Sequence, residues 1–469
     1  MTELKACMVS PIHSAAVLSS ERVAIKLPDE QISYKDLSQR VMALSKQLTD
    51  LGVNEGEPLA CISSNNLEMI CLYWACIEIG AIFFPISPRF PQAQIQSLID
   101  SHNIRYLWSD SAIAPGQSQA LKLNFAGSVV DTPKPLDINR PANVILTSGS
   151  SGTPKAAVHS LSNHIANAEG SLSTIDLEEG DSWLLSLPLF HIGGLAILNR
   201  CALKGATVVI PHPERSLTVQ IEQDKLTHIS LVPAQLAPIL AAPDANLHSI
   251  KALLLGGGAI SVDLLTELKH RNIACFTSYG MTEMGSQITT GPALADGSSG
   301  KLLPNRELKI IDGVIWVRGE TLFMGYLSHD GIHKELDNDG WFYTKDRGEW
   351  DANGNLKILG RVDNMFISGG ENVQPEEIEA ALKQHPQINE AIVFAEPDSR
   401  FGYLPAAIVR GDIVKQLAEK TAELDDYLSD KIARFKRPRH YYAWPESATQ
   451  TGLKINRSTI IEAMKAAKT

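Results

Sequence analysis

The sequence predicts an α/β fold: a large N-terminal domain of parallel-rich sheets with a β-rich subdomain, followed by a small α+β C-terminal domain. Between residues 33 and 276, short apolar runs of strand length alternate with helical patterns. After Gly291 the pattern changes to β-hairpins, and after Asp363 to a mixture of helices and strands. A chain of 469 residues also exceeds what one ordinary core accommodates, which favours several domains.

The first elements are predicted from caps and periodicity. Ser33 is a typical helix N-cap, apolar residues follow at spacings of three and four, and Gly52 ends the helix. Further strands are expected at 59–63, 81–85, 144–146, 183–186, 207–210, 229–232, 252–255 and 274–276, with helices at 68–79, 92–102, 163–170, 194–203, 234–241 and 262–270. This alternation indicates parallel sheets covered on both faces, which bind ligands at the carboxyl ends of their strands.

Hairpins and a second domain are predicted in the rest of the chain. Strands at 307–311 and 314–317 flank Asp312-Gly313, the signature of a type I′ turn, and strands at 348–350 and 356–359 form another hairpin. The last portion contains a helix at 375–383, strands at 390–394 and 405–409, a helix at 424–432 and a helix after Asn456. We place the domain boundary at Asp363, giving domains 1–362 and 363–469.

Composition limits the partners and the compartment. Lys and Arg number 42 against 53 Asp and Glu, and this net charge of −11 argues against nucleic acid or an anionic membrane as partner. The six cysteines stand singly in apolar segments, so neither a disulfide framework nor a cysteine-based metal site is expected. Glu78, Gly80 and Pro85 interrupt the apolar stretch 69–86, which excludes a membrane span there. A cytoplasmic protein is predicted, and a homo-oligomer is left open.

A serine- and glycine-rich stretch follows the apolar run that ends at Leu146. Small residues let backbone N–H groups approach a phosphate, and hydroxyls and a lysine add donors. The spacing is not the Walker pattern, because Thr153 and Pro154 separate the last glycine from the lysine. A flexible connector explains such a loop equally well on its own. The candidate phosphate ligands are Thr147, Ser148, Gly149, Ser150, Ser151, Gly152, Thr153 and Lys155.

A second candidate stretch runs from Ser278 to Glu283 directly after a predicted strand. Tyr279 offers a ring to lie against a base, Thr282 a donor to a phosphate, and Glu283 a carboxylate for a magnesium ion. Alone, this stretch is most typical of an ordinary loop.

Smaller signals lie elsewhere along the chain. Gly258 and Ala259 follow a strand, where either a flat ring or a tight turn fits. Asp346 offers a carboxylate to ribose hydroxyls, and Arg361 with Asp363 offers a guanidinium followed by a pivot. Taken singly, Asp346 is explained by solvation at a strand edge and the Arg361 segment by a surface turn.

Together and in this order, these stretches resemble the adenylate-forming superfamily, which includes acyl-CoA synthetases, peptide synthetase adenylation domains and firefly luciferase. The resemblance extends from about Ser33 to Lys454. It implies a two-step reaction: a carboxylate attacks the α-phosphorus of ATP to give an acyl-adenylate and pyrophosphate, and a CoA thiol then displaces AMP. ATP, Mg²⁺ and CoA are the implied cofactor and co-substrates. A non-catalytic nucleotide-binding module is the alternative, but it would not need both Glu283 and Lys454.

The resemblance also implies a role for each matched residue. Lys454 would be catalytic together with Thr282 and Glu283, and Glu283 would hold the metal. The serine–glycine loop would bind the β- and γ-phosphates. The rest of the nucleotide would contact Gly258, Ala259, Ser278, Tyr279, Gly280, Asp346 and Arg361. Asp363 would be the hinge of the C-terminal domain, which would bring Ser368, Gly369 and Gly370 to the CoA side.

A sharper resemblance, to the o-succinylbenzoate–CoA ligases of menaquinone biosynthesis, rests on 184–195, 278–290 and 368–377. It implies a substrate with two carboxylates, an aromatic ring and a ketone. Its pocket needs donors and a cation, for which the candidates are His191, Arg200, Ser286, Gln287 and Thr289. A CoA ligase for another aryl or fatty acid is the alternative.

Two departures from the pattern matter. Many relatives have glycine where Lys345 stands, which is tolerable because Asp346 is kept. Many also have a lysine before the glycine pair, where this chain reads Phe366-Ile367-Ser368, so the contacts with CoA stay undetermined.

Overall fold

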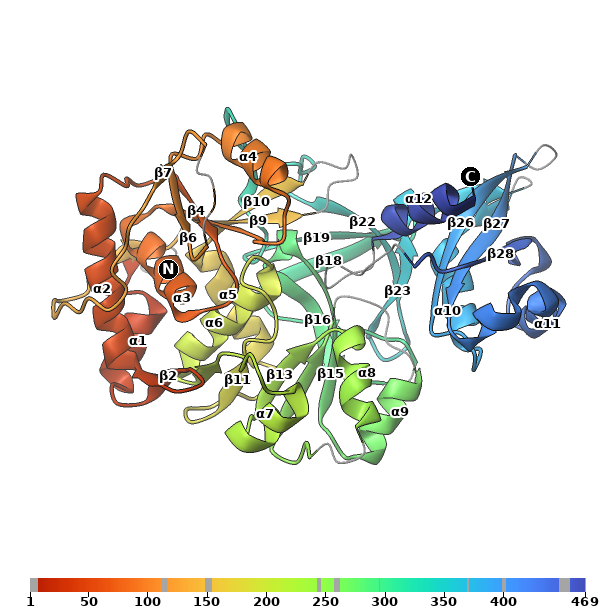
Figure 1. Ribbon diagram of the computed structural model, residues 1–469, viewed down its shortest axis with the longest axis horizontal. Helices are drawn as coiled ribbons and strands as arrows, with labels where there is room; N and C mark the ends of the chain where they lie inside the picture. Colours follow the sequence, from red (N-terminus) through yellow and green to blue (C-terminus); the bar gives the residue numbers. More distant parts are fainter. Residues whose placement is uncertain are drawn as a thin grey trace.

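The computed structural model describes residues 7–111, 113, 116–147, 154–242, 246–256, 262–294, 296–368, 371–398, 402–446 and 456–468. A large N-terminal body is followed by a small domain carrying β26, β27 and β28, and the two are joined through β23 (Figure 1). This arrangement confirms the predicted fold class. In the described part of the chain, no helix is both long enough and apolar enough to cross a membrane.

The larger of the two main sheets has nine strands in its described part, and its centre is parallel, from β2 through β12, β11, β13 and β14 to β15. Its far edge turns antiparallel at β16, which returns directly from β15. In spatial order the strands are β17 (Lys301–Leu302), β16 (Ser286–Pro292), β15 (Cys275–Met281), β14 (Ala252–Leu255), β13 (His228–Leu231), β11 (Ser182–Leu184), β12 (Thr207–Val209), β2 (Val23–Lys26) and β3 (Gln31–Ser33).

The second main sheet has eight strands in its described part. Strands β5, β4, β6 and β7 are parallel, whereas β9, β10 and β20 follow one another in antiparallel pairs. In spatial order the strands are β21 (Gly331–His333), β20 (Gly325–Ser328), β10 (Lys155–Ser160), β9 (Pro141–Thr147), β5 (Ile82–Ile86), β4 (Pro58–Ile62), β6 (Tyr106–Ser109) and β7 (Gln119–Ala120).

Helices lie between the two sheets and on their outer faces. Side chains alternate along a strand, so Leu59 and Cys61 of β4 enter the shared core while Ala60 and Ile62 enter an outer one. The shared core contains residues of α1 (Pro11–Leu18), α2 (Tyr34–Asp50), α3 (Leu67–Ile79), α5 (Leu161–Leu172) and α6 (Ile192–Lys204). The outer faces are covered by α4 (Gln92–Ser101) on one sheet and α7 (Leu217–Asp224), α8 (Pro233–Ala241) and α9 (Val262–His270) on the other (Figure 1).

The β-rich subdomain is a four-stranded antiparallel sheet. Asp312 and Gly313 both have positive φ angles, 51° and 75°, as the predicted type I′ turn requires. The strands are β18 (Arg306–Ile311), β19 (Val314–Gly319), β22 (Phe342–Trp350) and β23 (Leu356–Arg361).

The C-terminal domain packs helices against a three-stranded sheet. Its elements after the 3₁₀ turn Val362–Asn364 are β24 (Phe366–Ser368), β25 (Glu371–Val373), α10 (Pro375–Lys383), β26 (Glu390–Asp398), β27 (Gly402–Arg410), α11 (Leu417–Ser429), β28 (His440–Ala443) and α12 (Arg457–Lys468), with 3₁₀ turns at Asp412–Gln416 and Arg434–Lys436. One small antiparallel pair, β1 (Cys7–Met8) with β8 (Leu136–Asp137), completes the described strands.

Several predicted boundaries were wrong. The apolar residues after Lys155 form a strand, β10, that was not predicted, and β15 continues to Met281 through residues expected to form a loop. Helix α11 begins at Leu417, seven residues before the predicted helix at 424–432. Strand β16 was missed because its polar sequence, Ser-Gln-Ile-Thr-Thr-Gly-Pro, lacks an apolar run.

Candidate active site

Four predicted residues form one hydrogen-bonded chain, which we call the nucleotide network: Tyr279, Asp346, Arg361 and Asp363. The Tyr279 hydroxyl donates to Asp346 Oδ2 at 2.6 Å, and Arg361 Nη1 donates to Asp346 Oδ1 at 2.9 Å. Arg361 Nε and Nη2 donate to the two carboxylate oxygens of Asp363 at 2.9 and 3.0 Å. Antiparallel pairing of β22 with β23 sets Asp346 opposite Arg361, so the local fold builds this chain.

Charges within the nucleotide network stabilise one another. The hydrogen bonds from Arg361 to Asp363 raise the pKa of Arg361 above its ordinary value. Burial works to raise the pKa of Asp363, but Arg361 outweighs it and the pKa falls below its ordinary value. Burial, followed by the neighbouring Asp346, raises the pKa of Tyr279, which stays a neutral donor.

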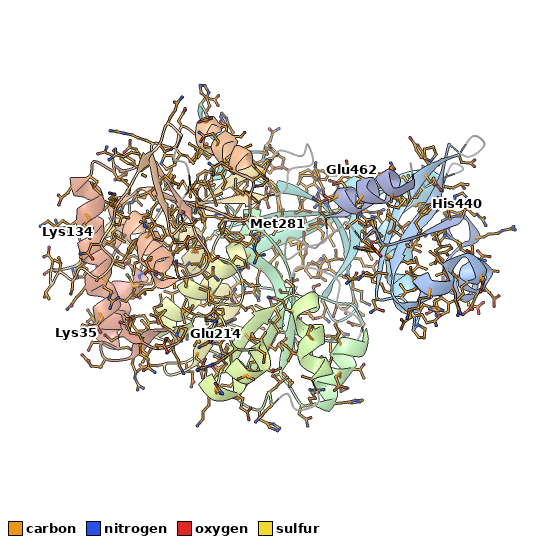
Figure 2. All side chains as sticks on the ribbon, viewed as in Figure 1. Lys35, Lys134, Glu214, Met281, His440 and Glu462 are labelled. Carbon is orange, nitrogen blue, oxygen red and sulfur yellow. The ribbon has the colours of Figure 1, made fainter. Side chains whose placement is uncertain are left out.

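Glu283 lies in a 3₁₀ turn, Thr282–Met284, immediately after β15. Figure 2 shows Met281, the residue before this turn, near the middle of the large domain. Glu283 is buried, and its Oε1 accepts a hydrogen bond of 2.7 Å from the hydroxyl of Tyr326. Burial raises the pKa of Glu283, whereas the Tyr326 hydrogen bond and the charge of Lys155 act in the opposite direction.

Lys155, on β10, lies close to Tyr326, the residue that donates to Glu283. Its Nζ donates to both oxygens of Glu335 at 2.6 and 2.9 Å and lies 4.5 Å from the centre of the Tyr326 ring. Thr147, the last residue of β9, pairs with Lys155, so the serine–glycine loop connects two neighbouring antiparallel strands. Residues 148–153, Gly258, Ala259, Gly369, Gly370 and Lys454 lie outside the described residues.

Two residues near the turn, Gly280 and Ser286, have unusual backbone surroundings. A side chain on Gly280 would bring its Cβ to within 1.8 Å of the carbonyl oxygen of Ser286, so only glycine fits there. Ser286 itself has φ 120°, which side-chain-bearing residues rarely adopt. The pairing of β15 with β16 shifts register between Tyr279 and Gly280, at the same point. Such strain commonly accompanies functional sites.

Arg200 and Gln287 meet at the predicted acid-binding end. Arg200, on α6, is 1% exposed, and its Nη2 donates to Gln287 Oε1 at 2.8 Å. Its guanidinium also lies 4.8 Å from the centre of the Trp183 ring. Arg200 Nε and Nη1 are buried and have no hydrogen-bond partner among the described residues. Burial lowers the pKa of Arg200 to about 10, so the side chain stays charged near pH 7.

A second buried arginine, Arg306, was missed by the sequence analysis. It is 6% exposed and donates to the backbone carbonyls of Gln287 (2.8 Å), Asn167 (3.3 Å) and Pro304. A Cβ on Gly170 would lie 2.1 Å from Arg306 Nη1, which explains a glycine inside α5. Burial, followed by the charge of Arg200, lowers the pKa of Arg306 to about 9. A single arginine beside a turn gives no sequence pattern that could have identified it.

The two residues, which we call the arginine pair, have no carboxylate within ion-pair distance among the described residues. Neither takes part in any salt bridge of the described chain. Because a buried charge is costly without a partner, this arrangement is suited to receive an anion.

The other predicted site residues have varied surroundings. His191 precedes α6, and its ring lies 4.9 Å from that of Phe190. Thr289 donates from its hydroxyl to the carbonyl of Ser299 at 2.7 Å. Ser278 donates to the carbonyl of Leu255 at 3.3 Å, at the carboxyl end of β14. Ser368 is buried at the end of β24.

Comparison with known proteins identifies the family. The model for AMP-binding enzymes matches residues 12–327, and the model for the AMP-binding enzyme C-terminal domain matches residues 377–453. The chain belongs to the AMP-binding enzymes. Among these enzymes, it is 34% identical over 446 residues to 2-succinylbenzoate–CoA ligase of Escherichia coli K12, covering 94% of this chain and 95% of the relative. It is 35% identical to the enzyme of the same name from Haemophilus influenzae, covering 94% and 95%.

Solved structures of AMP-binding enzymes agree with the sequence comparison. O-succinylbenzoate CoA synthetase (MenE) from Bacillus subtilis in complex with ATP and magnesium ion matches with a TM-score of 0.86 and 27% identity, covering 97% of this chain and 100% of that one. The same synthetase in complex with the acyl-adenylate intermediate OSB-AMP matches with a TM-score of 0.84 and 28% identity, covering 93% and 94%. These findings confirm the predicted superfamily and enzyme class.

The residues around Glu283 fit a magnesium ion that arrives with ATP. Among the described residues, no group of three or more histidine, cysteine, aspartate or glutamate side chains could enclose a metal. A single carboxylate is nevertheless what Mg²⁺ needs when substrate phosphates and water supply its other oxygen ligands. A nearby cation would also stabilise the buried Glu283 carboxylate.

Proposed function

We propose that this AMP-binding enzyme joins o-succinylbenzoate to CoA, using ATP and passing through an acyl-adenylate. The observation that carries the choice of acid is Arg200, a buried guanidinium with two unpartnered nitrogens beside Gln287. An acid with a second carboxylate supplies the missing anion, which a monocarboxylic acid cannot do. The full-length relatives named as 2-succinylbenzoate–CoA ligases support the same choice.

In the first step, a substrate carboxylate oxygen attacks the α-phosphorus of ATP, and the bond to pyrophosphate breaks. The chain mainly positions the reactants and stabilises negative charge. The nucleotide network presents Asp346 and Arg361 to the ribose, with Tyr279 beside the adenine. Glu283 would hold the magnesium ion, which would supply positive charge to the phosphates. Lys454 is proposed to stabilise the charge that develops in the transition state.

In the second step, the CoA thiolate attacks the acyl carbon and AMP leaves. We propose that the C-terminal domain, residues 363–469, rotates at Asp363 between the steps, which removes Lys454 and brings Ser368, Gly369 and Gly370 to the thiol. In the structure Asp363 is bound by Arg361, so the proposed pivot is tied to the ribose-binding residue.

At the acid end, Arg200 would bind the carboxylate that does not react. Its unpartnered Nε and Nη1 can donate charge-assisted hydrogen bonds, while Nη2 is held by Gln287 Oε1. His191, Ser286 and Thr289 remain proposed neighbours of the ring and ketone.

The proposed reaction also indicates the partners and the cellular compartment of the protein. Its partners are small molecules, and we propose a cytoplasmic location, where thiols stay reduced. Cys61, Cys71, Cys76, Cys201 and Cys275 are free thiols.

The test is CoA-thioester formation from ATP and Mg²⁺ with o-succinylbenzoate, its two monomethyl esters, benzoate and medium-chain fatty acids. We expect a strong preference for o-succinylbenzoate over every acid that has one free carboxylate. Turnover of a monocarboxylic acid at an equal or higher rate would overturn the proposed substrate. Binding of ATP without thioester from any acid would overturn the enzymatic assignment.

A further inference from the structure

His159 is a buried residue of β10 that contacts the turn carrying Glu283. Its side chain is fully buried, and its Nε2 lies 2.7 Å from the carbonyl oxygen of Thr282. A carbonyl oxygen only accepts hydrogen bonds, so Nε2 must carry the hydrogen. The contact therefore fixes the tautomer of the ring.

The opposite side of the His159 ring offers no competing contact. Its Nδ1 is buried and has no hydrogen-bond partner among the described residues. The ring lies 5.5 Å from that of His164, which is hydrogen-bonded to Asn143 Oδ1 at 2.6 Å. Burial lowers the pKa of His159 to about 4, although the bond to Thr282 opposes this. His159 is consequently neutral near pH 7, with its one N–H directed at Thr282.

Three contacts from different strands and loops of the described chain hold Thr282 and Glu283, the first two residues of the turn. His159 donates to the carbonyl of Thr282, which otherwise accepts only a 3.0 Å hydrogen bond from the N–H of Gly285 among the described residues. The N–H of Phe323 donates to the carbonyl of Glu283 at 2.8 Å, and the hydroxyl of Tyr326 donates to its carboxylate. Of these contacts, the one from His159 orients the first peptide of the turn.

We propose that His159 is a positioning residue for adenylate formation: its Nε2–H fixes the Thr282 carbonyl and so directs the Thr282 hydroxyl and the Glu283 carboxylate. The inference rests on the proposed function for the two half-reactions and for the proposed place of Glu283 beside the magnesium ion. The first half-reaction needs the triphosphate and its magnesium ion, which this turn is proposed to face. The second half-reaction begins from a bound adenylate and needs neither, so loss of His159 should affect the two steps unequally.

The experiment compares His159→Leu and His159→Gln with the matched control His164→Leu, which also replaces a buried histidine. Adenylate formation is measured by ATP–pyrophosphate exchange at varied Mg²⁺, and thioester formation from chemically prepared o-succinylbenzoyl-adenylate. We expect His159→Leu to slow exchange about 10- to 100-fold and to raise the Mg²⁺ requirement, as for other residues that orient ligands. Thioester formation should stay within about 2-fold, and His159→Gln, whose amide can donate, should recover part of the exchange.

Two results would overturn the inference. Equal losses in both half-reactions, matched by His164→Leu, would reduce His159 to a residue of the core. Nitrogen-15 NMR of histidine-labelled wild-type protein gives a test that no variant's folding can affect: a hydrogen on Nδ1 instead of Nε2 would exclude the bond to Thr282. Wild-type protein that exchanged pyrophosphate with none of the acids would overturn the proposed function and this inference together.

Discussion

At the nucleotide network, Arg361 donates to two carboxylates, whereas the arginine pair has no carboxylate partner among the described residues. The first cluster is complete before any ligand binds, because antiparallel strands set its residues side by side. The second cluster has no paired carboxylate among the described residues, although its guanidiniums are the more deeply buried. A region whose charges are already paired can hold a neutral ribose, and a region with unpaired cations is suited to a carboxylate.

The comparison predicts opposite effects on stability at the two places. Removing a charge from the nucleotide network leaves a partner unsatisfied and should destabilise the protein. Removing Arg200 takes away a buried charge that has no carboxylate partner among the described residues, and should stabilise the protein in the absence of substrate.

The largest expected effect is that of Arg200→Met. Loss of the carboxylate contact should lower kcat/KM for o-succinylbenzoate by about 100-fold or more, as expected for the loss of a buried charge partner. The KM for ATP should change little, and the free energy of unfolding without substrate should rise. Steady-state kinetics and thermal or denaturant unfolding measure both effects. Lys204→Met, an exposed charge on the same helix, is the control. A fall in stability would show that Arg200 is already compensated.

Asp346→Asn tests the paired region. Its hydrogen bonds from Tyr279 and Arg361 weaken when the carboxylate becomes an amide. We expect the free energy of unfolding to fall by about 1–2 kcal/mol and kcat/KM for ATP to fall by about 10-fold or more. Discrimination between acids should be unchanged. The exposed Asp412→Asn should leave stability and kinetics at wild-type values. Unchanged use of ATP in Asp346→Asn would remove Asp346 from the ribose site.

Arg306→Met tests whether Arg306 differs from Arg200 in its effects on stability and on acid selectivity. Its guanidinium binds backbone carbonyls, so the change should lower stability, in contrast to Arg200→Met. The preference for o-succinylbenzoate over its monomethyl esters should fall by about 10-fold, since one nearby positive charge is worth about 1–2 kcal/mol here. Arg306→Lys should keep most of the preference. If the methionine variant is less stable but equally selective, Arg306 acts only as a structural support.

The smallest effect is expected for Lys345→Gly. Lys345 has φ 65°, in the left-handed region that costs a side-chain-bearing residue about 1–2 kcal/mol. Glycine relieves that strain but adds entropy to the unfolded chain, so stability should rise by less than about 1 kcal/mol. Activity should stay within about 2-fold, as measured by the ATP dependence of thioester formation. Lys345→Ala, which keeps a Cβ, should give no gain. A clear loss of ATP use in the glycine variant would assign Lys345 a direct role.

The sequence alone determined the order of most of the main elements, and the resemblance pointed to the four residues that the structure joins in one hydrogen-bonded chain. Helix caps and tight turns depend on neighbouring residues, so a short stretch of sequence predicts them. Examples are the cap Ser33, whose side chain accepts a hydrogen bond from the N–H of Asp36, and the turn Asp312-Gly313. The resemblance implied that Asp346 and Arg361 both contact the nucleotide, and in the structure their strands are neighbours.

Tertiary structure decided what local patterns do not contain. Arg306, Tyr326 and His159 reach the site only because β18, β20 and β10 bring them there from distant parts of the chain. Burial also decides the chemistry of the site, since it keeps His159 neutral and lowers the pKa of Arg200, which has no carboxylate partner among the described residues. Burial and long-range contacts depend on how whole sheets pack, so no single stretch of sequence specifies them.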